Sequence, residues 1–472
     1  MGKVYLVGAG CGALDLYTLK AIQCIENADC LVYDALVDNR ILEKCKKDCE
    51  QIYVGKQMNN HAMKQEDICA LLVEKSKEHE VTVRLKGGDV YVFGRGGEEG
   101  QVLFESSVDF EVVPGLSSVT AGLAYAGVPI THRGLSGGFQ VYTGYLKEGE
   151  DRKFDYSKML DDYCTYVFLM SMSKLESIAT GFMNAGKKKE TPVAVISHAS
   201  MPTQRTLVST LENVVEDFKN DPLKNPGIIV VGDVVKMREY LNFYEKKPLF
   251  SKSCLVTSVG NDHYLKTKLD DLGANAYEYV TGEIAYLDTI LPEISGYLVF
   301  TSVHGVNGFM KNYLKQYKDV RSLYGVKIVC IGEKTNNALN EYGLDADIIP
   351  SQADSDVLNK ELAPLFKDNK VYLVKGENKT NIQNYTDEIV VYRNSEVKMN
   401  DECREYDYGF FTCASSVKRF SKMNKSTCRT YVSIGAHTTN ALKECYGDVK
   451  IIETSIALKD EMIKEVLEDL YV

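Results

Sequence analysis

The segment VRLKGGDVYVFGRGGEE (Val83–Glu99) decides the interpretation of the amino-terminal half of this chain. Its apolar run ends at Leu85, and glycines follow in two groups, Gly87-Gly88 and Gly94 to Gly97. Glycine raises the entropic cost of folding, so we expect such groups where the main chain turns at positive φ or where a ligand approaches its N–H and C=O groups. The segment therefore predicts a ligand-binding loop after a buried strand.

The composition is that of a globular protein with several domains. The chain has 472 residues, enough for about two to four domains. Hydrophobic residues make up 44% and charged residues 26%, as in ordinary globular domains, and no apolar run of about 18 residues predicts a membrane span. The start, MGKVYLVGAG, enters a strand directly, so we expect no secretory signal.

Charge and cysteine content exclude further classes. The formal net charge of −11 argues against a nucleic-acid-binding protein, because phosphate contacts need a basic surface. The 13 cysteines are odd in number and include no CxxC pair; the closest are Cys45 and Cys49. We therefore expect reduced thiols in a cytoplasmic protein, with no metal site.

Strand-like and helix-like segments alternate along the first half, which predicts an α/β fold. The expected strands and helices of a first unit are Val4–Val7, Leu14–Asn27, Cys30–Tyr33, Gln65–Glu78, Val81–Leu85 and Phe110–Val113. Those of a second unit, after Pro114-Gly115, are Phe139–Thr143, Tyr166–Met170, Pro192–Ile196 and Gly227–Val231. The polar segment Tyr244–Pro248 then marks a boundary, and Cys254–Ser258 begins a new strand.

The second half contains an internal repeat. LVFTSVHGVNGF (Leu298–Phe309) is echoed by GFFTCASSVKRF (Gly409–Phe420), and IGEKTNNAL (Ile331–Leu339) by IGAHTTNAL (Ile434–Leu442). The copies lie about 100 residues apart, the length of a domain. We therefore expect two similar lobes, in which strand ends offer N–H groups and hydroxyls to anionic ligands.

The glycine turn after the first strand has two interpretations. Gly8–Ala13 (GAGCGA) matches the GxGxxA pattern, and Asp34 closes the next strand, as in a dinucleotide-binding fold. This generic pattern alone would indicate an NAD site or an ordinary strand-to-helix turn. A longer series competes for the same residues, and its members occur in this order: VYLVGAGCGALDLYTLKA, LVYDALV, YVGK, VRLKGGD, VVPGLSS, YAGVPITHRG and PTQR.

This series resembles the tetrapyrrole methyltransferases, and the uroporphyrinogen-III C-methyltransferases in particular. The resemblance implies a two-domain tetrapyrrole methylase over residues 1–245, with sub-domains of about 1–114 and 115–245, and S-adenosyl-L-methionine as methyl donor. It also implies Asp34 as proton acceptor and Lys56 as proton donor. These roles suit attack of a pyrrole carbon on a sulfonium methyl group, because a carboxylate can accept a proton and stabilise positive charge on the ring. Asp34 could instead be a solvated strand-end carboxylate, and Lys56 could orient a carboxylate arm of the substrate.

The same resemblance implies a set of binding residues. The cofactor positions are Cys11, Gly87, Gly88, Asp89, Val92, Ser117, Ser118, Met170 and Ala199. Met170 could instead be a core residue. Two arginines, Arg95 and Arg133, are candidates to bind substrate carboxylates, unless they are solvated surface residues. The chain departs from the family pattern in having Cys11 and Ala13 for proline and aspartate, and Ala199 for glycine.

The segment Ser251–Val472 resembles uroporphyrinogen-III synthase, a bilobed family that cyclises hydroxymethylbilane without a cofactor. This implies lobe one at 251–280 plus 393–472 and lobe two at 284–392, with chain crossings near Tyr279-Val280 and Val391–Arg393. Tyr392 aligns with a tyrosine whose hydroxyl could aid loss of water, or it could be a packed aromatic. The candidates to bind carboxylates, or to cap helices, are Ser302, Thr335, Ser415 and Thr438. The family pattern asks for no histidine at His304 or His437.

Together these patterns predict a two-part α/β enzyme that makes uroporphyrinogen III from hydroxymethylbilane and methylates it twice to precorrin-2. We expect tetrapyrrole substrates, no nucleic-acid or membrane partner, and a homodimer formed through the methyltransferase half. The alternatives are an NAD-binding regulatory protein, a non-catalytic tetrapyrrole-binding scaffold, and a methyltransferase acting on a later corrinoid.

Overall fold

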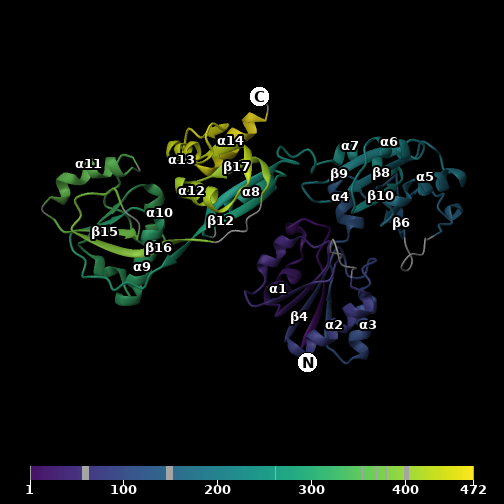
Figure 1. Ribbon diagram of the computed structural model, residues 1–472, viewed down its shortest axis with the longest axis horizontal. Coiled ribbons are helices and arrows are strands. Elements are labelled where there is room, and N and C mark those ends of the chain that lie inside the picture. Colours follow the sequence, from purple (N-terminus) through teal and green to yellow (C-terminus); the bar gives the residue numbers. More distant parts are fainter. Residues whose placement is uncertain are drawn as a thin grey trace. The chain divides into compact units, whose positions relative to one another are not determined.

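A computed structural model of the chain describes residues 2–55, 63–144, 153–260, 262–352, 354–367, 369–377, 380–397 and 403–470. It forms two compact units, Met1–Lys252 with Leu272–Asn275, and Ser253–Asp271 with Ala276–Val472 (Figure 1). In the described part of the chain, no helix combines the length and the apolar character that crossing a membrane requires.

The first unit begins with a parallel sheet in the order β3-β2-β4-β1-β5. Alternate residues of its strands face opposite sides, so that one face buries α1 and the 3-10 helix η2, and the other buries α2 and α3. The elements are β1 (Lys3–Gly8), α1 (Leu19–Asn27), β2 (Cys30–Tyr33), η2 (Asn39–Lys44), β3 (Glu50–Tyr53), α2 (Gln65–Glu78), β4 (Val81–Lys86), α3 (Gly96–Glu105) and β5 (Phe110–Val113). The four predicted strands of this sheet are confirmed.

The predicted helix Leu14–Asn27 is wrong in one respect, because the structure divides it into η1 (Leu14–Leu16) and α1. Thr18 lies between them in an extended conformation, and its hydroxyl accepts a hydrogen bond from the Ala21 N–H at 3.1 Å. A side chain that caps a helix start in this way defines a new N-terminus. The apolar spacing alone did not reveal this break.

A second, mixed sheet completes the first unit in the order β6-β7-β10-β8-β9. Only β6 and β7 pair in parallel; the other neighbours are antiparallel. Strand β9 was missed in the sequence because its polar residues and partial exposure hide its alternation. The elements are α4 (Leu123–Tyr125), β6 (Gly138–Thr143), β7 (Cys164–Leu169), α5 (Leu175–Asn184), β8 (Pro192–Ser197), β9 (Arg205–Thr210), α6 (Val214–Asn220), β10 (Gly227–Val231) and α7 (Arg238–Leu241).

The second unit is built on one nine-stranded sheet in the order β14-β13-β15-β16-β12-β11-β17-β18-β19. Its two long strands, β12 (Asn275–Tyr286) and β16 (Asp387–Glu396), pair antiparallel and lie between a group of parallel strands on either side. The positions where the family pattern placed the chain crossings lie in these two strands. The other strands are β11 (Ser253–Val259), β13 (Tyr297–Phe300), β14 (Lys327–Cys330), β15 (Val371–Gly376), β17 (Glu405–Phe411), β18 (Thr427–Ser433) and β19 (Ile451–Glu453).

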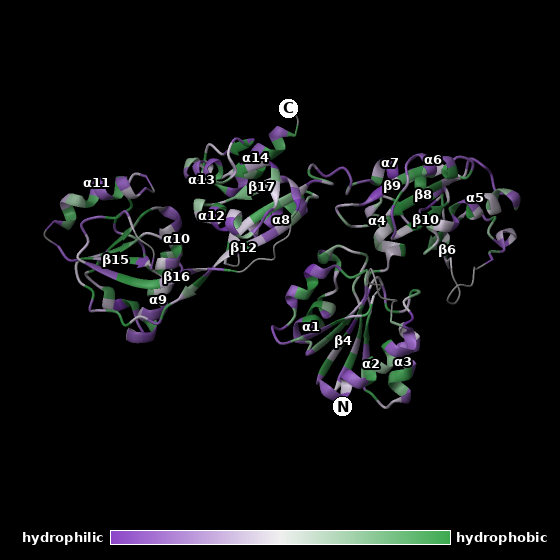
Figure 2. Ribbon diagram, viewed as in Figure 1, coloured by the Kyte–Doolittle hydropathy of each residue, from purple (hydrophilic) through white to green (hydrophobic). Residues whose placement is uncertain are grey.

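Both copies of the sequence repeat fold into the same strand-to-helix units. Strand β13 leads into α9 and β17 leads into α12, while β14 leads into α10 and β18 into α13. Strand β15 is buried along its length, and helices near it, such as α9 and α11, carry both hydrophobic and hydrophilic colours (Figure 2). The helices are α8 (Tyr264–Asp271), α9 (Val303–Tyr317), α10 (Glu333–Asn340), α11 (Ser355–Phe366), α12 (Ala414–Met423), α13 (Ala436–Tyr446) and α14 (Lys459–Asp469).

The core beneath α9 gives a direct test of this packing. Phe309 is fully buried between Phe300 and Tyr313, with ring centroids 5.4 Å from each. We predict that Phe309→Ala lowers the free energy of unfolding by about 3–5 kcal/mol, because it removes buried apolar area and leaves a cavity. Urea denaturation of the full chain measures this. Tyr324 is 97% exposed, so Tyr324→Ala should change the free energy of unfolding by about 0.5 kcal/mol or less. Equal losses in Phe309→Ala and Tyr324→Ala would contradict the packing of Phe309 in the core.

Candidate functional site

Three strand ends of the first sheet meet backbone to backbone at Gly8, Gly88 and Gly115. A Cβ atom at Gly8 would lie 2.4 Å from the Gly115 nitrogen, and one at Gly115 would lie 2.3 Å from the Gly88 oxygen. The Gly88 N–H also donates to the Gly10 carbonyl at 2.7 Å. Because no side chain fits between these segments, they place the loops after β1, β4 and β5 at one edge of the sheet, where ligands bind in open α/β sheets.

A cavity of about 390 Å³ opens at this edge, between the loops of the first sheet and those of the second. Its apolar wall includes Leu36, Val37, Ile196 and Ile228, and backbone groups of the glycine loops supply polar atoms. All nine residues that the sequence predicts for the cofactor line it: Cys11, Gly87, Gly88, Asp89, Val92, Ser117, Ser118, Met170 and Ala199. Its size and lining are those of a site for a small organic ligand.

Two of these residues adopt a local structure that the sequence did not reveal. Met170 has φ +53 and a side chain that is 52% exposed, so its interpretation as a core residue is wrong. Asp89 is held by the main chain: one carboxylate oxygen accepts from the Tyr91 and Val92 N–H groups at 2.9 and 3.1 Å, and the other accepts from the Gly115 N–H at 3.1 Å. Asp89 therefore shapes the loop as well as lining the cavity.

The departure at Cys11 is accommodated by Ser200, which sequence reasoning missed. The Cys11 thiol lies 3.2 Å from the Ser200 hydroxyl oxygen, which also accepts from the Ala13 N–H at 3.2 Å. Burial raises the pKa of the Cys11 thiol. Gln204 in turn accepts a hydrogen bond from the Ser200 N–H at 2.8 Å. These contacts connect the turn after β1 to the loop after β8, and both segments line the cavity. In the family pattern a proline stiffens this turn.

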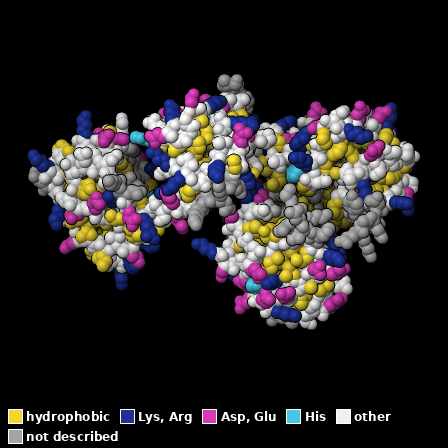
Figure 3. Space-filling view, viewed as in Figure 1, with side chains coloured by type: hydrophobic (Ala, Val, Ile, Leu, Met, Phe, Trp, Pro, Cys, Tyr) yellow, Lys and Arg dark blue, Asp and Glu magenta, His cyan; other side chains and the backbone are white. Residues whose placement is uncertain are grey.

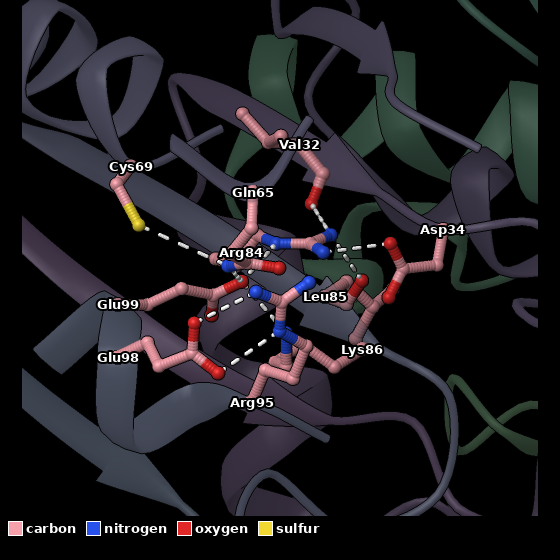
Figure 4. Close-up of polar contacts among 10 residues, drawn as sticks. All are labelled: Val32, Asp34, Gln65, Cys69, Arg84, Leu85, Lys86, Arg95, Glu98 and Glu99. Carbon is pink, nitrogen blue, oxygen red and sulfur yellow. Dashed lines mark hydrogen bonds and ion pairs between the residues drawn. The ribbon is translucent and has the colours of Figure 1, made fainter. Parts of the chain in front are cut away.

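A buried network of charges lies beside the cavity (Figure 4). Glu99 is fully buried, and its Oε1 accepts hydrogen bonds from Lys86 Nζ at 2.7 Å and Arg84 Nε at 3.3 Å. Gln65 Nε2 donates to the same oxygen at 3.0 Å. Arg84, only 2% exposed, uses Nη2 to donate to Asp34 Oδ1 at 2.6 Å. Burial and the charge of Arg84 lower the pKa of Lys86.

This network fixes Asp34 at the end of β2, directly before the cavity-lining residues Ala35 to Asp38. The Asp34 side chain is 30% exposed, so it is not simply a solvated carboxylate at a strand end. A carboxylate held in one orientation can accept a proton and can stabilise a nearby positive charge. Lys56, its predicted partner, lies outside the described residues. The sequence contained Arg84 and Glu99 within the deciding motif, but burial was needed to reveal their connection.

The predicted substrate arginines are on the surface. Arg95, at φ +58 directly before α3, donates to both carboxylate oxygens of Glu98, at 2.9 and 2.8 Å. Arg133 is exposed. Neither is among the residues that line the cavity, although Phe93 and Gly94 before Arg95 are. Basic and acidic side chains are interspersed over the face of the molecule that Figure 3 shows.

In the second unit the structure brings two predicted residues together. The hydroxyl oxygens of Tyr392 and Ser302 lie 3.2 Å apart, and Ser302 also caps α9 by accepting from the Gly305 N–H at 3.0 Å. Thr335 and Thr438 are buried in the first turns of α10 and α13. The Ser415 hydroxyl lies 3.2 Å from the Cys413 thiol. Capping therefore accounts for Ser302, which is also the one of these four predicted residues for which the described part of the chain shows a hydrogen bond to Tyr392.

A smaller cavity of about 160 Å³ lies in this unit. None of the residues that line it was among the predicted site residues, and His304 had been set aside because the family pattern asks for no histidine there. They are Val256, Thr257, Ser258, Val259, Asp262, Leu265, His304, Thr412, Cys413 and Lys459. They come from segments far apart in the chain, which no local pattern could bring together.

Adjacent glutamates test the buried charge network. We predict that Glu99→Gln lowers the free energy of unfolding by about 3 kcal/mol, because it removes the counter-charge of the buried Lys86 and leaves Asp34 as the partner of the buried Arg84. Glu98→Gln removes an exposed partner of Arg95 and should cost about 0.5 kcal/mol. Urea denaturation compares the two. If Glu99→Gln is as stable as Glu98→Gln, Glu99 does not stabilise the buried charges as we predict.

Comparison with known families confirms both family expectations. The model of the tetrapyrrole (corrin/porphyrin) methylases matches residues 3–215. That of uroporphyrinogen-III synthase HemD matches residues 264–459. These ranges fall in the first and second units of the structure, respectively.

Individual relatives of the chain carry the names of the same two families or of siroheme synthase. The porphyrin biosynthesis protein HemD of Ruminiclostridium josui is 34% identical over 99% of this chain and 98% of its own. The uroporphyrinogen-III C-methyltransferase of Bacillus subtilis is 36% identical over 72% of each chain. The siroheme synthase of a Psychrobacter species is 40% identical over 52% of this chain, which spans 50% of that relative's length.

Among solved structures, the uroporphyrin-III C-methyl transferase of Thermus thermophilus, complexed with S-adenyl homocysteine, is 39% identical over 50% of this chain and 99% of its own, with a TM-score of 0.44. The relative from Ruminiclostridium josui matches along nearly the whole chain, across both units. The chain therefore belongs to the tetrapyrrole methylases in its amino-terminal unit and to the uroporphyrinogen-III synthases in its carboxyl-terminal unit, two families of enzymes.

Proposed function

We propose that this chain is a bifunctional enzyme that cyclises hydroxymethylbilane to uroporphyrinogen III and methylates uroporphyrinogen III twice to give precorrin-2, with S-adenosyl-L-methionine as methyl donor. One observation carries the methylation: nine residues from separate motifs line one cavity beside the fixed carboxylate of Asp34. The cyclisation rests on the family of the second unit and on the contact between Tyr392 and Ser302.

The lining of the large cavity fits the methyl donor. Gly88 lies at φ +74, and a Cβ built there would meet nothing within 4 Å, so the space beside its backbone is open to a ligand. Main-chain groups at Gly87 and Gly88 and the hydroxyls of Ser117 and Ser118 would hold the polar parts of the donor, while Leu36 and other apolar residues would contact its uncharged parts. When bound, the donor supplies an electrophilic methyl group.

The residues of the first unit have distinct tasks in the transfer. The Asp34 carboxylate faces the developing positive charge of the pyrrole ring and accepts the proton that the ring releases. Arg84 holds that carboxylate in place, and Glu99 holds Arg84. We also propose that the methyltransferase half forms a homodimer and that the enzyme works in the cytoplasm.

In the second unit the protein mainly has to hold a flexible substrate in the conformation that closes correctly, which is catalysis by orientation. The Tyr392 hydroxyl can donate a proton to the departing hydroxyl of hydroxymethylbilane. Ser302 is positioned to accept from or donate to that phenol at 3.2 Å, and its own place is fixed by the Gly305 N–H.

Ligand-induced stabilisation separates a methyl-donor site from an NAD site. We predict that S-adenosylhomocysteine raises the melting temperature of the purified protein, because a ligand that binds only the folded state at a hundred times its Kd adds about 2.7 kcal/mol. NAD at the same concentration should leave it unchanged. Stabilisation by NAD alone would favour the dinucleotide-binding alternative.

Product analysis tests both reactions and assigns them to separate residues. With hydroxymethylbilane alone we expect uroporphyrinogen III, and with added S-adenosylmethionine we expect precorrin-2. Asp34→Ala should lower methylation by about 100-fold or more and leave the cyclisation intact. Tyr392→Phe should slow only the cyclisation. Chromatography of the oxidised tetrapyrroles measures both, and loss of both activities in either variant would contradict separate sites.

A further inference from the structure

We infer that His304 is the proton acceptor for ring closure in the carboxyl-terminal unit. The inference rests on the proposed synthase activity and adds to it a residue that the family pattern does not require. His304 lies in the first turn of α9, two positions after the Ser302 cap. The observations that carry it are its contacts, the cavity that it lines and its charge environment.

His304 contacts two tyrosines that face each other across paired strands. Tyr286 of β12 and Tyr392 of β16 are directly opposite in the antiparallel pair. The imidazole of His304 packs on the Tyr392 ring, with centroids 5.7 Å apart and planes at 56°. Its Nδ1 lies 3.5 Å from the Tyr286 hydroxyl oxygen. The histidine is therefore held beside the phenol that is the candidate proton donor.

The same histidine lines the cavity of about 160 Å³, opposite residues of β11. Ser258, at the end of β11, also lines this cavity and is only 4% exposed. Its hydroxyl has no hydrogen-bond partner in the part of the chain that the structure describes. A buried hydroxyl without a partner beside a cavity indicates that a polar ligand atom supplies the missing bond. His304 is thus placed where a substrate with polar groups can reach it.

The surroundings favour an uncharged imidazole. Burial, together with the positive charge of Lys334 on α10, lowers the pKa of His304 below its ordinary value of 6.5. The other titratable groups around it are the two tyrosine hydroxyls and, on the cavity wall, Cys413 and the ion pair of Asp262 with Lys459. Asp262 is paired with Lys459 and also lies within range of the charge of Lys334. A neutral imidazole has a nitrogen lone pair that can accept a proton.

The reaction needs such an acceptor. The hydroxymethyl group leaves as water after its oxygen takes up one proton, and the carbon–oxygen bond breaks. The carbon that lost the hydroxyl then bonds to the substituted α-carbon of the last ring, and the bond from that α-carbon to its neighbouring methylene breaks, which inverts the ring. The freed methylene bonds to the unsubstituted α-carbon, whose hydrogen leaves as a proton while its bonding electrons restore the aromatic ring. One proton is taken up and one is released, so hydroxymethylbilane gives uroporphyrinogen III and water without an oxidant. Tyr392 supplies the first proton, and His304 receives the second.

His437 provides a matched control. It also lies in the first turn of a helix of the repeat, α13, whose counterpart in the other copy is α10, but its side chain is exposed and it is not among the residues that line the cavity. We compare His304→Gln, which keeps the size and polarity of the side chain but cannot accept a proton at neutral pH, with His437→Gln in the full-length protein. Initial rates of uroporphyrinogen III formation from hydroxymethylbilane are measured, with the ratio of isomers I and III.

We expect His304→Gln to lower kcat by about 100-fold or more with little change in KM, and His437→Gln to match the wild type. The wild-type rate should fall as the pH drops through the pKa of His304, since protonation removes the acceptor, and His304→Gln should lose this acidic decline. Methylation of added uroporphyrinogen III should be unchanged, and urea denaturation of the full-length variant reports whether its carboxyl-terminal unit is folded.

Two results would overturn the inference: a kcat within about threefold of the wild type in His304→Gln, or a wild-type pH profile without a decline below pH 6.5. The pH dependence of the wild-type rate needs no variant, so it tests the role of His304 even if His304→Gln misfolds. A wild-type protein that yields only isomer I would instead refute the synthase function itself. Failure of the proposed function can therefore be told apart from failure of the role given to His304.

Discussion

The close meeting of Gly8, Gly88 and Gly115 is the constraint on which the amino-terminal unit depends. A Cβ atom at Gly8 would clash with Gly115, and one at Gly115 would clash with the Gly88 carbonyl oxygen, so the loops that follow the three strands converge at one sheet edge. The cavity, the bound position of Asp89 and the orientation of Cys11 toward Ser200 all follow from that convergence. Glu99 pairs with Arg84, and Arg84 in turn holds the Asp34 carboxylate at the end of β2, which belongs to the same sheet. Burying these charges costs free energy unless each is paired, so their orientation is strongly specified.

The carboxyl-terminal unit positions its candidate residues through helix starts and a pair of long strands. Its repeated strand-to-helix units present helix starts, and its two long strands bring Tyr286 and Tyr392 face to face. Ser302 and His304 come from one such helix start, so a single turn of α9 supplies contacts to both the phenol and the cavity. A protein that controls the conformation of a reactive chain needs few strong acids and bases, but those it has must be well placed. In the inferred mechanism, Tyr392 is the acid and His304 is the base, and their rings are in contact.

Much of this organisation could be predicted from the sequence, because its signals are local. The glycine motifs and apolar strands predicted the first sheet, and the repeat predicted the paired strand-to-helix units. Long-range features were not predictable: Ser200 contacts Cys11 although 189 positions separate them in the chain, and the charges of Arg84 and Glu99 meet only because β4 and α3 pack together. Thr18 caps the start of α1 and so divides a segment that apolar spacing would read as one helix. His304 was set aside because no family motif includes it, and only its contact with Tyr392 revealed it.

The central claim is that the amino-terminal glycine loops hold a sulfonium methyl donor beside Asp34. A crystal structure of the protein grown with S-adenosylhomocysteine tests it most directly. The account predicts the ligand in the large cavity, with its polar atoms bonded to the main chain at Gly87 and Gly88. An empty cavity at saturating ligand, or a cavity that takes up a nicotinamide dinucleotide instead, would contradict it.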